Sequence, residues 1–263
     1  MKKRLIIPLA VLLSICFSCL NAMGAGTNIK KPSSVLELSR ENTYPNPTQD
    51  VPHLKPSELA KQLLSSAGME IENPDLIRLM NESAISNTKV SIGYKATIFL
   101  GQWPLNYESS ETAVNWEYQK INTNKLDNRG GTKPGQMTYV QEQQKRVKGG
   151  LTAYIPNPEE VKKMMLLESM KKTNLPLSFE TVVGQGTKKD QVYNVPLRKI
   201  GYLNAYAPAV NEKGKVTYGE VYLVLKGHSQ KLMIKNVVSQ GIGAWIPVQD
   251  HASFSYSLAE TPR

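Results

Sequence analysis

Residues 89–100 read Lys89-Val90-Ser91-Ile92-Gly93-Tyr94-Lys95-Ala96-Thr97-Ile98-Phe99-Leu100, and this stretch decides the fold class of the chain. Apolar side chains recur at every second position from Val90 to Leu100 and alternate with lysine, serine and threonine. A period of two is typical of a strand with one dry and one wet face. The alternation returns at Val114, Trp116 and Tyr118, so the sequence predicts a neighbouring strand there.

More strands are expected further along the chain. The loop over residues 128–135 is rich in Asn, Gly and Pro, and it predicts a turn into a return strand over 137–147. That return strand is unusually polar, which predicts a sheet edge or a protruding hairpin. Gly227-His228-Ser229-Gln230 predicts a hairpin turn between two later strands. The later strands are expected over residues 192–206, 216–226, 232–238 and 253–258.

Helix signals occur at three places. Ser57 and Asn73 are expected to cap helices over residues 58–67 and 74–80, and Asn157 a longer one over 158–172. Strands that flank separate helices without regular βα alternation predict an α+β fold, with a mostly antiparallel sheet packed by a few short helices. No flexible linker follows Pro56, so residues 57–263 are expected to form a single domain.

The first 25 residues have the features of a secretory signal peptide. Three positive residues precede an apolar run from Leu5 to Leu20, and small residues suited to cleavage follow up to Ala25. The run holds about 16 residues, whereas a spanning helix needs about 20. We therefore expect cleavage and a location outside the cytoplasm, either secreted or associated with the cell envelope. Lipidation at Cys19 or retention of the segment are the alternatives.

Residues 26–56 are predicted to form a proline-rich extended arm. Each proline fixes its own φ and biases the preceding residue toward extended geometry, which excludes helix through most of the arm. We expect the arm to dock on the body from Tyr44 onward, because Tyr44-Pro45-Asn46-Pro47 and the patch from Val51 to Leu54 offer apolar contacts.

The charge of the chain indicates a class of partner. Residues 1–25 contain three of the 32 Lys and Arg and none of the 22 Asp and Glu, so the remaining chain has a net charge of +7. Outside the cytoplasm a basic protein is attracted to an anionic cell-wall polymer or membrane surface. An envelope protein is the alternative partner, and a role of the charge in solubility alone is the plainer interpretation. Nucleic acid is not expected, since no recognition motif accompanies the charge.

Five residues are candidates for binding. Lys145, Arg146 and Lys148 form a basic patch, and charge reversal there is expected to weaken envelope association. Trp103 and Trp245 could stack on sugar rings, although core packing explains the tryptophans more simply.

No strong motif for catalysis, metal or cofactor occurs. The three histidines are scattered without the spacing of a metal site, and no cofactor is expected. Ser86 and Lys89, with Tyr202-Leu203-Asn204 and Lys226-Gly227-His228, loosely resemble the pattern of penicillin-binding enzymes. However, Ser86 leads into a strand instead of a helix, and the last motif lacks its hydroxyl residue. A noncatalytic envelope protein is therefore the leading hypothesis, and a cell-wall serine hydrolase using Ser86 and Lys89 is the alternative.

Two regions resemble a known family. They are Pro32 to Gly68, with Glu41-Asn42-Thr43-Tyr44-Pro45-Asn46-Pro47, and Lys226 to His251, with Gly241-Ile242-Gly243-Ala244-Trp245-Ile246-Pro247. In these residues the chain is similar to the YfkD-like family of exported proteins from Gram-positive, spore-forming bacteria. The resemblance implies export and a single family-wide domain. It implies no activity and no site residues, because the family has none assigned.

Overall fold

A computed structural model describes residues 29–38, 54–82, 95–227 and 229–262 of the chain, and every structural statement below concerns these residues. The predicted signal peptide over 1–25 lies outside them. So do Ser86 and Lys89 of the hydrolase alternative, and Tyr44, from which the arm was expected to dock.

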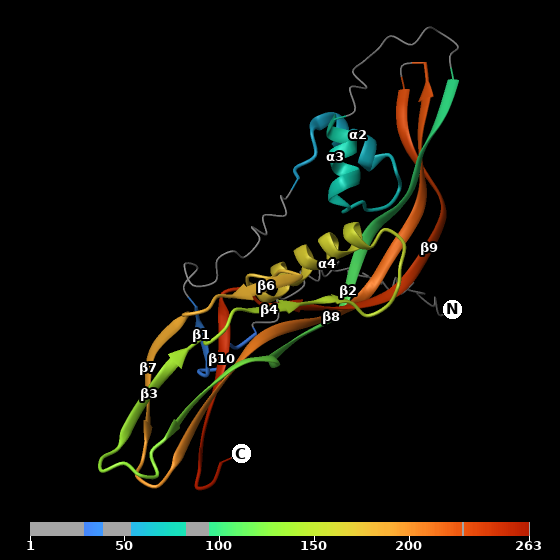
Figure 1. Cartoon of the computed structure of the whole chain (residues 1–263). Helices are drawn as coiled ribbons and strands as arrows, with labels where there is room; N and C mark the ends of the chain where they lie inside the picture. The colour runs from blue at the N-terminus through green and yellow to red at the C-terminus, as the bar shows by residue number, and fades with distance from the viewer. Residues whose placement is uncertain (1–28, 39–53, 83–94, 228, 263) are drawn as a thin grey trace, which may run out of the picture.

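Three long antiparallel strands form the spine of an elongated, strongly twisted sheet (Figure 1). Strand β2 spans Lys95–Asp127, β8 spans Ile200–Lys226 and β9 spans Ser229–Pro247. β2 pairs with β8 along its whole length. The other edge of β8 is divided, because its C-terminal part pairs with β9 and its N-terminal part with β10 (His251–Ala259). At about 3.3 Å per residue, β2 alone would extend roughly 100 Å if it were straight.

Short strands complete the sheet at both sides. β1 (Val35–Glu37) pairs with β10, and β5 (Gly150–Leu151) pairs with β9. Residues 35–37 therefore pair with the sheet ahead of Tyr44, the residue from which docking was expected. Every strand pairing among the described residues is antiparallel, which confirms that part of the fold prediction.

The strands are longer and fewer than predicted in the centre of the sheet. The segments expected near 95–100 and 114–118 belong to one strand. The segment expected over 192–206 is divided, because one strand ends at Val195 and β8, which also contains the segment expected over 216–226, begins at Ile200. Five register shifts along β2 take up its irregular residues. One of these shifts lies beside Pro104, which cannot donate a ladder hydrogen bond and is tolerated at a sheet edge or bulge.

The prediction of a single return strand over 137–147 is wrong. Two short strands occupy that region, β3 (Gly135–Val140) and β4 (Lys145–Lys148). They pair with β7 (Lys188–Val195) and β6 (Glu180–Val183), which lie beyond a helix in the sequence. The predicted hairpin turn is confirmed, because β8 and β9 pair up to Lys226 and Ser229 around Gly227, whose φ is +56°.

All three predicted helices are present: α2 (Glu58–Ser65), α3 (Pro74–Glu82) and α4 (Pro158–Thr173). The Ser57 hydroxyl accepts a hydrogen bond from the Ala60 N–H at 3.2 Å, as a cap should. Asn157 stands at the N-cap position of α4, as predicted, but it has a φ of 49° and its side chain makes no cap hydrogen bond. None of these helices is long and apolar enough to cross a bilayer.

The helices cover opposite faces of β8 at successive levels. Val221 and Leu223 pack against α2 and α3, whereas Val216 and Tyr218 pack against α4. Side chains alternate between faces along a strand, so these odd and even positions point in opposite directions. The chain passes around the edge of β2 before α3 begins, where the N–H groups of residues 72 and 73 donate to the Leu105 carbonyl.

Candidate binding surfaces

The basic stretch of β4 is divided between two environments. Arg146 and Lys148 are exposed and share one partner, because Arg146 pairs with Glu180 and the Lys148 ammonium lies 3.8 Å from the same carboxylate. Lys145 is half-buried and lies on the same face of β4 as the buried Val147, two residues further along the strand. Glu180 therefore offsets part of the charge that this stretch would present to a polyanion.

The two candidate tryptophans lie in different packing environments. Trp103 is half-buried beside the core under α2 and α3, and its indole N–H donates to the Leu100 carbonyl at 3.0 Å. Trp245 stacks on Tyr118 with ring centroids 5.0 Å apart. Their neighbours on β8 are Gly219 and Asn211, about 26 Å apart along a strand, so the two indoles do not share one sugar platform.

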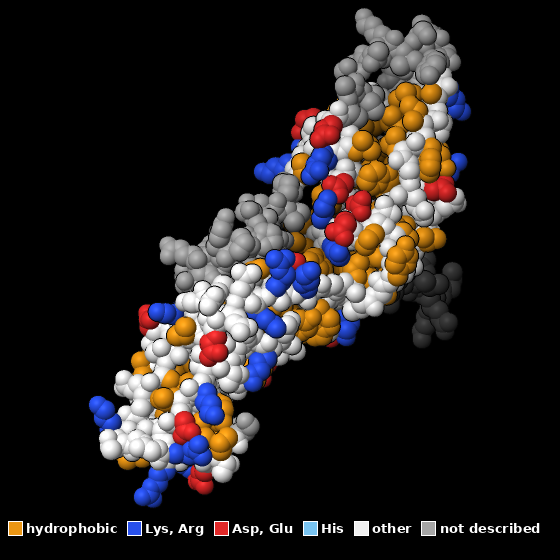
Figure 2. Space-filling model, in the orientation of Figure 1, with side chains coloured by type: hydrophobic (Ala, Val, Ile, Leu, Met, Phe, Trp, Pro, Cys, Tyr) orange, Lys and Arg blue, Asp and Glu red, His pale blue; other side chains and the backbone are white. Residues whose placement is uncertain are grey.

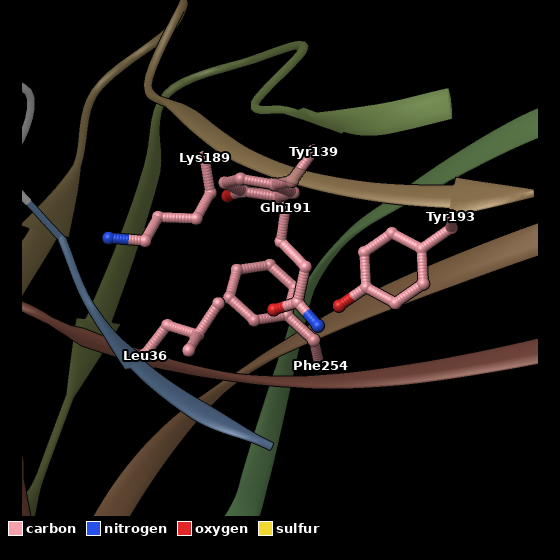
Figure 3. A pocket seen from close by; sticks show the side chains of 6 residues that line it. All are labelled: Leu36, Tyr139, Lys189, Gln191, Tyr193 and Phe254. Atoms are coloured by element: carbon pink, nitrogen blue, oxygen red, sulfur yellow. The ribbon is translucent and has the colours of Figure 1, made fainter. Parts of the chain in front are cut away.

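A shallow pocket of about 120 Å³ lies where β1, β3, β7 and β10 come together (Figure 3). Its lining residues come from four strands and are Leu36, Tyr139, Lys189, Gln191, Tyr193 and Phe254. The rings of Tyr139 and Phe254 meet edge to face at 4.8 Å, and the Tyr139 hydroxyl donates to Gln141. The Lys189 ammonium points away from the rings and donates to the Glu37 carbonyl at 3.0 Å. Small-molecule sites usually enclose several hundred Å³, so this pocket is a packing feature.

A buried carboxylate lies where β2 and β8 pass α4. Glu212 is fully buried and accepts hydrogen bonds from the Tyr107 hydroxyl at 2.9 Å and the Thr112 hydroxyl at 2.6 Å. Burial, and then the charge of Glu212, raise the pKa of Tyr107 well above 10. Both hydroxyls donate to the same carboxylate, so these three side chains stabilise the pairing of β2 with β8. Within the described residues, no cluster of three or more His, Cys, Asp or Glu could hold a metal ion.

One sheet surface, which we call the tip face, gathers lysines and apolar side chains at the upper end. It is the face of β2, β8 and β9 that points away from α2 and α3. Cross-strand neighbours share a face, and four rows build this one. The rows are Lys95–Lys226–Ser229, Thr97–Val224–Lys231, Phe99–Tyr222–Met233 and Gln102–Glu220–Lys235.

The charges of the tip face are strongly unbalanced. Its four lysines are all exposed, and Glu220 is its one acid. Hydrogen bonds from Asn236 and then from Tyr222 lower the pKa of Glu220, and the Tyr222 hydroxyl donates to it at 2.7 Å. The Lys235 ammonium lies 5.3 Å from the centroid of the Tyr222 ring. Glu220 is thus engaged by neutral donors of the same surface, and the four lysines dominate the charge there.

Sequence inspection alone misses the tip face. Lys95 is more than 100 residues from the nearest of the other three lysines. These three lie on the two strands of one hairpin, so they share a surface only once β8 and β9 are paired. The usable signal was the predicted hairpin at residues 227–230, which brings Lys226 and Lys231 close together. Pairing with β2, which adds Lys95 and Phe99, has no signal in the sequence.

Comparisons with known proteins give two informative matches. A family model described as "YfkD-like protein" matches residues 32–263. The chain is 62% identical over 263 residues to "Uncharacterized protein YfkD" of Bacillus subtilis (strain 168), and the match covers 100% of both chains. Among solved structures, that of lamprey immune protein aligns with 62% of this chain and 53% of its own, at 8% identity. Its TM-score of 0.27 is too low to support an argument about the fold.

Proposed function

The chain belongs to the YfkD-like family, and from this premise we propose that it is an exported, noncatalytic protein of the cell envelope that binds an anionic surface. Family membership confirms the resemblance noted in the sequence. The binding activity, the export and the anionic partner are the proposal. An anionic cell-wall polymer and a membrane surface are the two partners that fit it, and an envelope protein with an acidic patch is the third.

The tip face is the observation that carries this proposal. Four exposed lysines and one engaged glutamate lie within four neighbouring rows of the sheet. Like charges face each other directly at Lys95 and Lys226, an arrangement that costs stability in a sheet. An anionic ligand would remove that repulsion. Its attraction would be screened by salt, because exposed charges interact over a Debye length of about 8 Å at physiological ionic strength.

Cosedimentation with isolated cell walls and with anionic vesicles, at low and high salt, tests the proposal. The test variant carries Lys226→Glu and Lys231→Glu. The control carries Lys133→Glu and Lys188→Glu at the opposite end, which changes the net charge by the same amount. We expect retention at low salt, and we expect the tip variant to lose it while the control keeps it. Absence of retention on both surfaces, or equal loss in both variants, would contradict the proposal.

Export is tested separately by cell fractionation. The producing cell is expected to place the protein outside the cytoplasm, and its N-terminal residue, determined by mass spectrometry, is expected to lie near residue 26. A chain found in the cytoplasm with Met1 or Lys2 at its start would contradict this part of the proposal.

A further inference from the structure

We propose that the tip face docks the protein on an anionic phospholipid bilayer, with the Phe99 ring entering the interfacial layer. This inference rests on the proposed function and chooses the membrane over the wall as the anionic surface. Figure 2 shows the upper strands from the side on which α2 and α3 lie; the tip face points away from these helices and is defined by its cross-strand rows.

The apolar residues of the tip face give the reason for this choice. Phe99 is 57% exposed, and its ring lies 5.1 Å from the ring of Tyr222, which is itself half-buried. Met233 adjoins Tyr222 on the next strand and is also half-buried. Aromatic rings favour the interface between lipid headgroups and acyl chains. A hydrated wall polymer would leave Phe99 in water, so it would gain nothing from this row of side chains.

The lysines stand in the positions that headgroup contact requires. Lys95 and Lys226 lie on one side of the aromatic row and Lys235 lies on the other, with Lys231 beside Met233 on β9. Lysine stems cover apolar surface while their ammonium groups reach the phosphates. Each lysine near an anionic membrane strengthens binding by about fivefold. Four lysines around one apolar row therefore combine both attractions that hold a protein on a membrane surface.

Ile98, the residue before Phe99, provides an internal control for this geometry. Ile98 lies on the same strand but points to the α2–α3 face, and it is 45% exposed. Ile98→Ser and Phe99→Ser thus remove apolar surface from adjacent positions on opposite faces. If the protein docks through the tip face, Phe99→Ser weakens vesicle binding and Ile98→Ser does not.

Vesicle flotation with the protein produced from its complete sequence tests the inference. Vesicles of phosphatidylglycerol and phosphatidylcholine are compared with pure phosphatidylcholine, and isolated cell walls are assayed in parallel. The full chain is expected to float with the anionic vesicles only. Phe99→Ser is expected to weaken that partitioning about tenfold and to leave wall retention unchanged, whereas Ile98→Ser leaves both unchanged.

The outcomes separate this inference from the proposed function. Binding to walls but not to anionic vesicles would overturn lipid docking and leave the proposed function standing. Binding to neither would overturn both. Equal vesicle binding of Phe99→Ser and the parent chain would also overturn the docking, provided that circular dichroism shows both folded.

A fluorescent variant covers the case in which Phe99→Ser does not fold. Phe99→Trp keeps an aromatic ring at the position and adds a fourth tryptophan to Trp103, Trp116 and Trp245, so the added emission is the difference between the variant and the parent chain. Vesicles with brominated acyl chains are expected to quench this added emission. Emission unchanged by brominated lipid, with the protein floating on the vesicles, would show that Phe99 stays outside the bilayer and would overturn the inference.

Discussion

The Tyr107 hydroxyl donates a hydrogen bond to the fully buried carboxylate of Glu212 at 2.9 Å, across 105 residues of sequence. This contact joins β2 to β8 where α4 packs on the sheet, within the same cluster of buried residues that holds Val216 and Ile242. A buried carboxylate without hydrogen-bond donors costs free energy, so the stability of the β2–β8 pairing at this level depends on the Tyr107–Glu212 contact.

Tyr107→Phe is expected to lower the free energy of unfolding by about 2 kcal/mol, because it removes one of the two hydroxyl donors of the buried Glu212 carboxylate and leaves the Thr112 hydroxyl. Urea denaturation followed by circular dichroism measures the loss. Tyr154→Phe is the control, since the Tyr154 side chain is 92% exposed. A change below about 0.5 kcal/mol at Tyr107 would mean that Glu212 finds another donor.

Gly214→Ala is expected to destabilise the protein by at least about 2 kcal/mol. A Cβ atom there would lie 2.3 Å from the Glu108 carbonyl and 2.5 Å from the Tyr107 hydroxyl. Gly241→Ala on the neighbouring strand is the matched control, because its Cβ would meet nothing closer than 3.9 Å. Similar melting temperatures for the two variants would argue against the close contact of Tyr107 with β8.

Two asparagines at helix starts are expected to respond differently to replacement by glycine. The Asn73 side chain accepts from the Asp75 N–H at 2.9 Å and donates to the Pro104 carbonyl at 2.7 Å, so Asn73→Gly should cost about 2 kcal/mol. Asn157 has a φ of 49° and no side-chain cap bond, so Asn157→Gly should be neutral or slightly stabilising. Thermal unfolding compares them, and a larger loss at Asn157 would contradict both assignments.

Stability is expected to fall between pH 10 and pH 12. Burial raises the pKa of Tyr218 from 10 to about 12, so the folded state holds the Tyr218 proton that the unfolded chain releases. The contribution of this group to stability is complete below pH 10 and is lost as the pH rises toward 12. Denaturation at several pH values measures the slope, and Tyr218→Phe should reduce it. An unchanged slope in that variant would assign the effect to other tyrosines.

Glu180→Gln is expected to increase retention on isolated cell walls at low salt. Glu180 pairs with Arg146 and lies 3.8 Å from the Lys148 ammonium, so its neutralisation leaves both cations available to a polyanion. Glu260→Gln, which breaks the exposed pair with Lys199, gives the same change in net charge elsewhere. An equal increase in both variants would reflect net charge alone and would remove the β4 residues from consideration as a site.

The predictions from sequence succeeded where local rules decide structure. Ser57, Pro74 and Pro158 start helices for reasons contained within one turn of chain, and the two-residue period identified the strands. The failure at 137–147 has a physical reason. A polar edge strand has no apolar pattern that specifies its partner, so β3 and β4 could not be assigned to β7 and β6 in advance.

By itself, the sequence determined the element types, the largely antiparallel character of the sheet, the family and the net charge. Local propensity, side-chain period and similarity along the chain are sufficient for these properties. Only the tertiary structure decided which residues share a surface. Lys95 and Phe99 reach Lys226 and Tyr222 through β-pairing between segments more than 100 residues apart, and Tyr107 reaches Glu212 in the same way. Such contacts depend on register, which the whole buried core sets and no single segment encodes.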